Sequence, residues 1–140
     1  MKKEFSAMIL AAGFGKRMLS LTDQIPKPLI EINKVSLLKN CIDFLFLIGC
    51  KKIVINTHYK HNLIFDFINN FYSSFNIEIS YEKNLLDTAG GVKNAIKKFD
   101  DKNILVINSD VYLKKENESD VIELIDNYDT NDLCKLLLVD

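Results

Sequence analysis

The sequence predicts an α/β fold in which helices cover a largely parallel central sheet. Two observations indicate this fold. Short apolar runs alternate with stretches of helical periodicity, and small or polar residues such as Gly, Asn and Asp separate them. The length of 140 residues corresponds to a single domain, and a domain of this size can bury about 68–70% of its unfolded surface. We therefore expect one domain over residues 1–140.

The apolar runs are expected to form the strands. Residues 5–10 are the first run, and their mostly apolar character indicates a strand buried on both faces. The expected strands are residues 5–10, 52–56, 77–81, 104–107 and 133–139. Residues 28–32 are expected to form a further short extended piece, and Asn33-Lys34 a turn.

Apolar residues spaced three and four apart predict the helices. In the first helix they are Leu37, Leu38, Cys41, Ile42, Leu45 and Ile48, and Gly49 is the expected stop. The expected helices are residues 36–48, 63–71, 92–99 and about 121–128. Residues 87–91 are expected to be a turn of small residues. Because the strands alternate with helices, the sheet should be mostly parallel.

Composition excludes several classes of function. Lys and Arg total 18 and Asp and Glu 19, which gives a net charge of −1. This balance argues against a nucleic acid or a membrane surface as partner, and no apolar run approaches the length of a membrane span. Three cysteines without C-x-x-C spacing are typical of reduced, structural thiols, so we expect a cytoplasmic protein with buried thiols. The sequence leaves the oligomeric state open.

The stretch from Ala11 to Leu29 carries the clearest chemical signal. Gly13 and Gly15 directly follow the first strand, and glycine lets the backbone approach a ligand closely. Arg17 offers a fork of donors suited to phosphate oxygens. Lys27 lies between two prolines, so its backbone is stiff. Together these residues predict a loop that binds a nucleoside triphosphate, rather than an ordinary strand-to-helix turn.

Two common phosphate-binding motifs do not fit this stretch. The Walker loop requires G-x-x-x-x-G-K-[S/T], but Leu10 occupies the first glycine position and Arg17 the Ser/Thr position. The dinucleotide motif requires G-x-G-x-x-G, but Met18 occupies the third glycine position. Residues 10–29 instead resemble the signature of the sugar-1-phosphate nucleotidyltransferases, L-A-A-G-x-G-x-R-[M/L]-x-P-L-T-x-x-x-P-K-P-L. One departure is Ser20, where the family usually has Pro.

An acidic residue after the fourth strand supports this interpretation. Asp110 ends the stretch Asn108-Ser109-Asp110, and it would face the glycine loop if the first and fourth strands are neighbours. A carboxylate beside phosphates is best explained as a Mg²⁺ ligand, although an isolated Asp after a strand is more often a cap or turn residue.

The resemblance extends to a second loop and implies site residues there. The family's base-reading loop often reads P-L-G-T-A-G, and residues 85–91 here read L-L-D-T-A-G-G. The resemblance implies a Rossmann-like three-layer sandwich of the nucleotide-diphospho-sugar transferase type. It covers most of the chain, but family members are much longer, so this chain would be the N-terminal part of the domain and a second Mg²⁺ aspartate is not assigned. Within the family, Asp87 and the Asn-Ser-Asp pattern look most like the N-acetylmuramate-1-phosphate uridylyltransferases of cell-wall recycling.

The implied reaction joins a nucleoside monophosphate from a triphosphate to a sugar 1-phosphate and releases pyrophosphate. The expected catalytic residues are Arg17 and Lys27, with Asp110 binding Mg²⁺ and Asn108 binding substrate. The expected nucleotide-binding residues are Leu10, Ala11, Ala12, Gly13, Gly15, Glu82, Asp87, Thr88 and Gly90. Alternatives are a nucleotide-binding module without turnover, because the chain is short, and an inactive subunit of a larger enzyme.

The base is harder to predict. Uridylyltransferases of the family commonly have Gln five positions before the glycine of the base-reading loop, and Glu82 stands at that position here. A carboxylate only accepts hydrogen bonds, so it could take the N3–H of uracil or both the N1–H and the N2 amine of guanine, and this chemistry favours guanine. The likeness to the muramate enzymes favours UTP and N-acetylmuramate 1-phosphate, which is our first expectation. A mannose-1-phosphate-type guanylyltransferase is the alternative.

Overall fold

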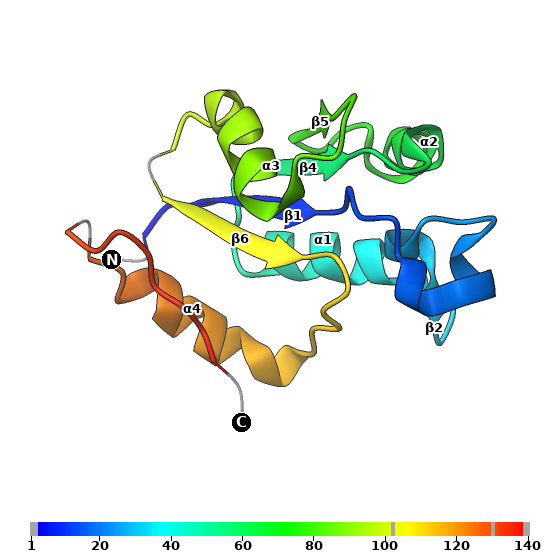
Figure 1. Cartoon of the computed structure of the whole chain (residues 1–140). Coiled ribbons are helices and arrows are strands. Elements are labelled where there is room, and N and C mark those ends of the chain that lie inside the picture. The colour runs from blue at the N-terminus through cyan, green and yellow to red at the C-terminus, as the bar shows by residue number, and fades with distance from the viewer. Residues whose placement is uncertain (1–2, 102, 130, 139–140) are drawn as a thin grey trace.

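The computed structural model describes residues 3–101, 103–129 and 131–138. Its main sheet contains β1 (Ser6–Leu10), β4 (Ile53–Thr57), β5 (Ile77–Tyr81) and β6 (Ile104–Asn108), in the order β5-β4-β1-β6 (Figure 1). Every pairing in this sheet is parallel. The predicted α/β fold with a parallel sheet is therefore confirmed, and β1 and β6 are neighbours as the site prediction required.

Four α-helices connect and cover the strands: α1 (Leu37–Leu47), α2 (His61–Tyr72), α3 (Asp87–Ala95) and α4 (Glu118–Asp126). Helix α1 begins after Ser36, whose hydroxyl accepts a hydrogen bond from the Lys39 backbone N–H at 3.1 Å. The shorter 3₁₀ turns are η1 (Lys16–Thr22), η2 (Lys27–Leu29), η3 (Ile96–Lys98) and η4 (Lys115–Asn117). No helix within the described ranges has the length and apolar character required to cross a bilayer.

The two faces of the sheet are covered by different helices. Ala7, Ile9 and Ile55 point to one face, where they pack with residues of α1, α2 and α4. Met8 and Val54 point to the other face, where they pack against Ala95 of α3. Figure 1 shows α3 on one side of the sheet and α1 and α4 on the other. The alternation arises because successive side chains of a strand point to opposite faces.

Two short elements differ from the sequence prediction. The piece expected to be extended over 28–32 is a 3₁₀ turn, η2, followed by β2 (Glu31–Ile32). Strand β2 pairs antiparallel with β3 (Val35–Ser36), and the predicted turn Asn33-Lys34 joins them. Both turn residues have positive φ, 52° and 66°, as a tight hairpin turn requires.

The small-residue turn expected over 87–91 is wrong. These residues form the first turns of α3, and the predicted helix over 92–99 divides into the end of α3 and η3. Glycine has low helix propensity, which is why the sequence indicated a turn. Gly91 is retained inside the helix because a Cβ there would lie 2.7 Å from Asn56 Nδ2 and 2.8 Å from Glu82 Oε1. Packing therefore overrides propensity.

The fifth strand expected over 133–139 is also wrong within the described residues. Residues 133–138 are exposed and form no strand, and residue 139 lies outside the described ranges. The segment instead runs beside α4, where Lys135 Nζ donates to the Asn127 carbonyl at 2.9 Å. An apolar run forms a strand only if it can pair in register with the edge of a sheet. The composition of the run does not show whether such an edge is available.

Candidate functional site

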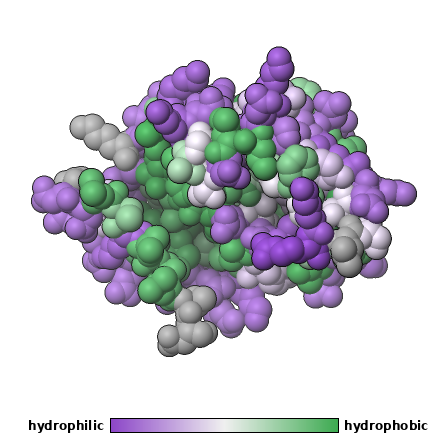
Figure 2. Space-filling model, in the orientation of Figure 1, coloured by the Kyte–Doolittle hydropathy of each residue, from purple (hydrophilic) through white to green (hydrophobic). Residues whose placement is uncertain are grey.

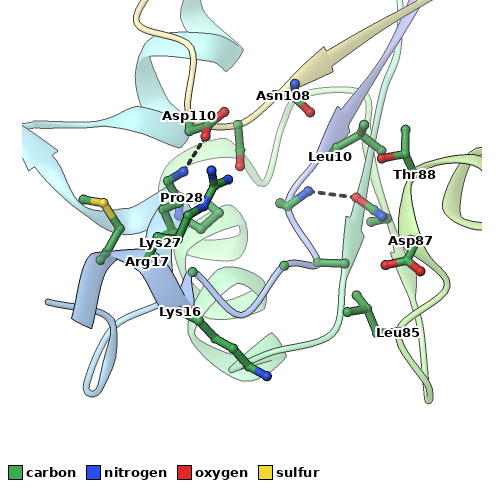
Figure 3. A pocket seen from close by; sticks show the side chains of 17 residues that line it. Leu10, Lys16, Arg17, Lys27, Pro28, Leu85, Asp87, Thr88, Asn108 and Asp110 are labelled. Atoms are coloured by element: carbon green, nitrogen blue, oxygen red, sulfur yellow. Dashed lines mark hydrogen bonds and ion pairs between the residues drawn. The ribbon is translucent and has the colours of Figure 1, made fainter. Parts of the chain in front are cut away.

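A cavity of about 420 Å³ opens at the carboxyl ends of the parallel strands (Figure 3). Its walls come from the loop after β1, the turn η2, the start of α3 and the residues that follow β6. The chain passes from β1 to β4 and β5 on one side and returns to β6 on the other, so β1 and β6 mark the switch point of the topology. Ligands of open parallel sheets bind at such a point.

Most predicted site residues line this cavity. Those that do so are Leu10, Ala11, Ala12, Gly13, Gly15, Arg17, Lys27, Asp87, Thr88, Asn108 and Asp110. The predicted residues Glu82 and Gly90 do not line it. The sequence prediction did not include several lining residues, namely Lys16, Met18, Pro28, Asn56, Leu85 and Ser109. Asn56 could have been found, because a polar residue ending a buried parallel strand faces the same edge of the sheet.

Gly15 fixes the course of the first loop. Its φ is +66°, and a Cβ there would lie 2.8 Å from Thr22 Cγ2 and 3.2 Å from Lys27 Cβ. The Gly15 carbonyl accepts from the Met18 N–H at 2.8 Å and from the Thr22 hydroxyl at 3.2 Å. These bonds start η1, which carries Lys16 and Arg17 into the cavity wall. Only glycine combines this backbone conformation with such close packing.

Gly13 has a different environment. No atom lies within 4 Å of the position that its Cβ would occupy, and Gly13 lines the cavity. The fold itself therefore does not require glycine here. A side chain at this position would occupy space at the cavity wall, where a ligand could approach the backbone.

Lys27 and Asp110, from two separate elements, form an ion pair on one wall of the cavity. Lys27 begins η2 between Pro26 and Pro28, and the turn is closed by a 3.1 Å bond from the Ile30 N–H to the Lys27 carbonyl. Asp110 follows β6, whose end is tied to β1 by a 3.1 Å bond from the Ser109 N–H to the Leu10 carbonyl. The Lys27 ammonium forms an ion pair with the Asp110 carboxylate, drawn as a dashed line in Figure 3. The predicted placement of Asp110 opposite the glycine loop is therefore found.

The second loop forms the opposite wall. Asp87 begins α3 with φ of +57°, a left-handed conformation that Asp, Asn and Gly tolerate best. This explains why the resembling family loop often has Gly at the same place. Figure 3 shows Leu85, Asp87 and Thr88 across the cavity from Lys16, Arg17 and Lys27 of the turns η1 and η2.

Glu82 is buried behind this wall rather than exposed in it. The residue is 2% exposed. Its Oε1 accepts from Asn56 Nδ2 at 2.8 Å and its Oε2 accepts from the Leu86 N–H at 3.0 Å. The predicted direct contact of Glu82 with a base is therefore not favoured by this geometry.

The cavity has the donors and acceptors that a nucleotide and a divalent cation require. Lys16, Arg17 and Lys27 supply positive charge for phosphate oxygens. No three potential ligand side chains gather into a metal site among the residues that the structure describes. The Asp110 carboxylate still fits Mg²⁺, which commonly binds one or two carboxylates and takes its other ligands from phosphates and water.

Cys41 lies close to the site but is not a nucleophile. Burial, with a smaller contribution from the Asp110 charge, raises the pKa of the Cys41 thiol to about 12. The thiol is therefore protonated at neutral pH and unreactive. Cys50 is likewise buried, whereas Cys134 is exposed, contrary to the expectation that all three thiols are buried.

The fold and cavity define an α/β protein with a cavity at its topological switch point that is lined by three cationic side chains, Lys16, Arg17 and Lys27. Residues 6–139 match the family model described as "Nucleotidyl transferase", and the chain belongs to this family. It is 34% identical over 104 residues to D-glycero-alpha-D-manno-heptose 1-phosphate guanylyltransferase of Aneurinibacillus thermoaerophilus, covering 74% of this chain and 45% of the relative. It is 37% identical over 108 residues to mannose-1-phosphate guanyltransferase of Gibberella zeae, covering 74% and 30%.

A solved structure gives the same result for the fold. The crystal structure of HddC from Yersinia pseudotuberculosis complexed with GMP-PN superposes with a TM-score of 0.73 at 27% identity, covering 89% of this chain and 55% of that chain. The match covers 45% and 30% of the two curated relatives above, so this chain spans less than half the length of each. The relatives named here are guanylyltransferases, which favours the guanylyl alternative over the expected muramate uridylyltransferase.

Proposed function

We propose that this chain provides the nucleotide-binding part of a sugar-1-phosphate nucleotidyltransferase that uses GTP and a heptose or mannose 1-phosphate. The observation that carries the proposal is that the glycine loop, Arg17, the Lys27–Asp110 pair and the start of α3 all line the same cavity. The family match and the named guanylyltransferases support it.

The chemistry that these residues support needs no protein nucleophile. An oxygen of the sugar phosphate attacks the α-phosphorus of the triphosphate, a new P–O bond forms, and the bond to pyrophosphate breaks. A phosphate monoester is already largely ionised near pH 7, because its second pKa is about 6. Catalysis then depends on positioning and on neutralising charge. Arg17 holds the leaving pyrophosphate, and Lys27 contacts the α-phosphate or the incoming phosphate.

Asp110 holds the divalent cation in this proposal. Mg²⁺, when bound, would neutralise charge on the phosphate oxygens, and Asp110 is the carboxylate on the Lys27 side of the cavity. Asn108, at the end of β6, lines the same wall and offers an amide to the sugar phosphate. Gly13 and Gly15 keep the first loop open to the nucleotide.

Asp87 is the residue through which this cavity would distinguish guanine from uracil. Its carboxylate lines the wall opposite the cations, and a carboxylate can accept from both the N1–H and the N2 amine of guanine. Uracil presents only one such donor, N3–H, beside two carbonyl acceptors. Asp87→Asn keeps a residue that tolerates the left-handed backbone at this position while removing one acceptor, so it should reduce the preference for GTP.

A competition assay tests the proposal. Equimolar GTP, UTP, CTP and dTTP are supplied with heptose, mannose and N-acetylmuramate 1-phosphates, and products and pyrophosphate are measured. A dominant GDP-sugar is expected, because a site built around donor and acceptor positions rejects the wrong partner strongly. A dominant UDP-N-acetylmuramate would instead support the first expectation from the sequence, a muramate uridylyltransferase. Binding of GTP without pyrophosphate release would favour the binding-module alternative, for which the partial length is the supporting observation.

A further inference from the structure

A chain of buried hydrogen bonds joins the two walls of the cavity. The Ala11 N–H, in the first loop, donates to Asn56 Oδ1 at 2.8 Å. Asn56 Nδ2 donates to Glu82 Oε1 at 2.8 Å, and Glu82 Oε2 accepts from the Leu86 N–H at 3.0 Å. Leu86 immediately precedes Asp87 and Thr88 of the second wall. We name Asn56 and Glu82 the bracket, because they span the distance between the loops.

The bracket is buried and tightly enclosed. Asn56 and Glu82 are 3% and 2% exposed. Gly91 of α3 packs directly on both, and even one methyl group there would collide with them. The backbone of Glu82 is held as well, because its N–H donates to the Thr57 carbonyl at 2.8 Å and its carbonyl pairs with His58 Nδ1 at 2.9 Å. The two side chains therefore have little freedom to move.

The direction of the hydrogen bonds is fixed at both ends. The Ala11 and Leu86 backbone groups can only donate, so the residue at position 56 must accept on one side, and the residue at position 82 must accept on its outer side. Asn and Glu satisfy this pattern with one buried charge. A buried polar pair that is fully satisfied rigidifies its surroundings, whereas a partly satisfied one is costly.

We propose that Asn56 and Glu82 are positioning residues that hold the two walls of the cleft at the separation required by the nucleotide. This inference rests on the proposed function, because it assigns the pair a role in binding at the same site. It also replaces the sequence-based prediction that Glu82 reads the base directly. The bracket acts through Ala11 and Leu86, and a nucleotide is held between those loops.

A reciprocal substitution tests the bracket. Glu82→Gln leaves a single acceptor oxygen for two donors, and Asn56→Asp places two carboxylates against each other. The double variant Asn56→Asp/Glu82→Gln restores all three hydrogen bonds with one buried charge, because Gln Nε2 then donates to the Asp at position 56. Each single variant should bind GTP at least about ten-fold more weakly, the cost of about one buried hydrogen bond, and the double variant should regain affinity to within about three-fold.

Calorimetric titration with GTP supplies the readout, and Asn94→Ala is the matched control. Asn94, on α3, makes a side-chain hydrogen bond to Ser80 Oγ at 3.2 Å and lies outside the bracket. The control should bind GTP like the wild type. A double variant as weak as Glu82→Gln would overturn the proposal, because it would mean that the Glu82 carboxylate acts on the nucleotide itself. Single variants with unchanged affinity would overturn it as well.

Amide hydrogen exchange separates failure of the bracket from failure of the proposed function. The Ala11 and Leu86 N–H groups should exchange slowly in the wild type and the double variant and faster in each single variant, without any ligand. If the wild type binds no GTP but the amides show this exchange pattern, the proposed function is wrong, whereas the role of the bracket in connecting the two loops is supported. If neither amide responds to the single variants, the bracket fails even where GTP binds.

Discussion

Strands β1 and β6 are neighbours in one sheet and have similar apolar sequences, yet their surroundings differ. The first four residues of β1 are buried, whereas the residues of β6 are half-buried or exposed, with Val106 at 41%. Strand β1 has a partner on each side, but β6 is the edge of the sheet. Figure 2 shows apolar side chains gathered on the face in view, over β6 and α4. The sheet is therefore packed around β1, whereas the face over β6 is open.

This difference shows what an apolar strand sequence can predict. Both sequences predicted strands correctly, because a continuous apolar run is typical of a strand in a parallel sheet. The prediction that residues 5–10 are buried on both faces is confirmed for β1, but the similar apolar run at 104–107 did not indicate that β6 is left partly exposed. The leucines of residues 133–138 extend the same open region, since Leu133, Leu136 and Leu138 are exposed.

The largest effect on stability is expected on the packed side, at Gly15. Gly15→Ala should lower the free energy of unfolding by at least about 1–2 kcal/mol, because the left-handed conformation is costly for any residue with a Cβ and this Cβ would also strike Thr22. Urea unfolding measures the change. Gly13→Ala is the matched control, because its Cβ meets nothing, and its stability should stay within about 0.5 kcal/mol of the wild type. Equal losses at both positions would contradict the account of the loop.

The next effect concerns the ion pair between β6 and η2. Lys27→Ala and Asp110→Asn should each lower kcat by about 10²–10³, since each removes a charge-stabilising group from the phosphate site. Pyrophosphate release at limiting Mg²⁺ measures this loss. Lys39→Ala, which breaks the exposed Lys39–Asp43 pair of α1, is the control and should leave kcat unchanged. Near-wild-type turnover of Asp110→Asn would remove that residue from cation binding.

The open side predicts association. The exposed apolar side chains over β6 and α4, together with a free strand edge, favour contact between molecules. Light scattering of the 140-residue chain over a range of concentrations should show species larger than a monomer. Val106→Lys, which places a charge on the exposed edge strand, should reduce the association. A stable monomer at high concentration would contradict the prediction that this apolar face mediates association.

The smallest effect contrasts the thiols of the two sides. Burial, opposed in part by hydrogen bonding to the Lys52 backbone, raises the pKa of the Cys50 thiol to about 12, and Cys41 is raised similarly. At pH 8 about one part in ten thousand of each is thiolate. Only the exposed Cys134 should therefore react with a thiol reagent in the native chain, and all three should react in denaturant. Rapid reaction of two thiols in the native chain would contradict the packing of α1 against the sheet.

The sequence was informative at positions where the residue type is suited to one particular chemical role. The glycine loop, Arg17, Lys27 and Asp110 were predicted from their order along the chain, and the parallel sheet brings them to one cavity. The sequence was misleading at positions where side-chain packing determines the local structure. Glu82 matched a base-contact position, but its carboxylate is turned inward to Asn56, a partner 26 residues away. The sequence also failed to predict the helix at 87–95, because Gly91 indicated a turn. In the structure Gly91 leaves room for the side chains of Asn56 and Glu82.

Titration of the chain with GTP and Mg²⁺ tests the central claim most directly, which is that the cavity at the ends of β1 and β6 binds a nucleotide. We predict saturable binding with one site, and thermal stabilisation that grows with GTP to about 2.7 kcal/mol at one hundred times the dissociation constant. Arg17→Ala should weaken binding at least about ten-fold, whereas Lys97→Ala, on the exposed η3 turn, should not change it. A chain that shows no binding, or that binds equally well after Arg17→Ala, would contradict the account.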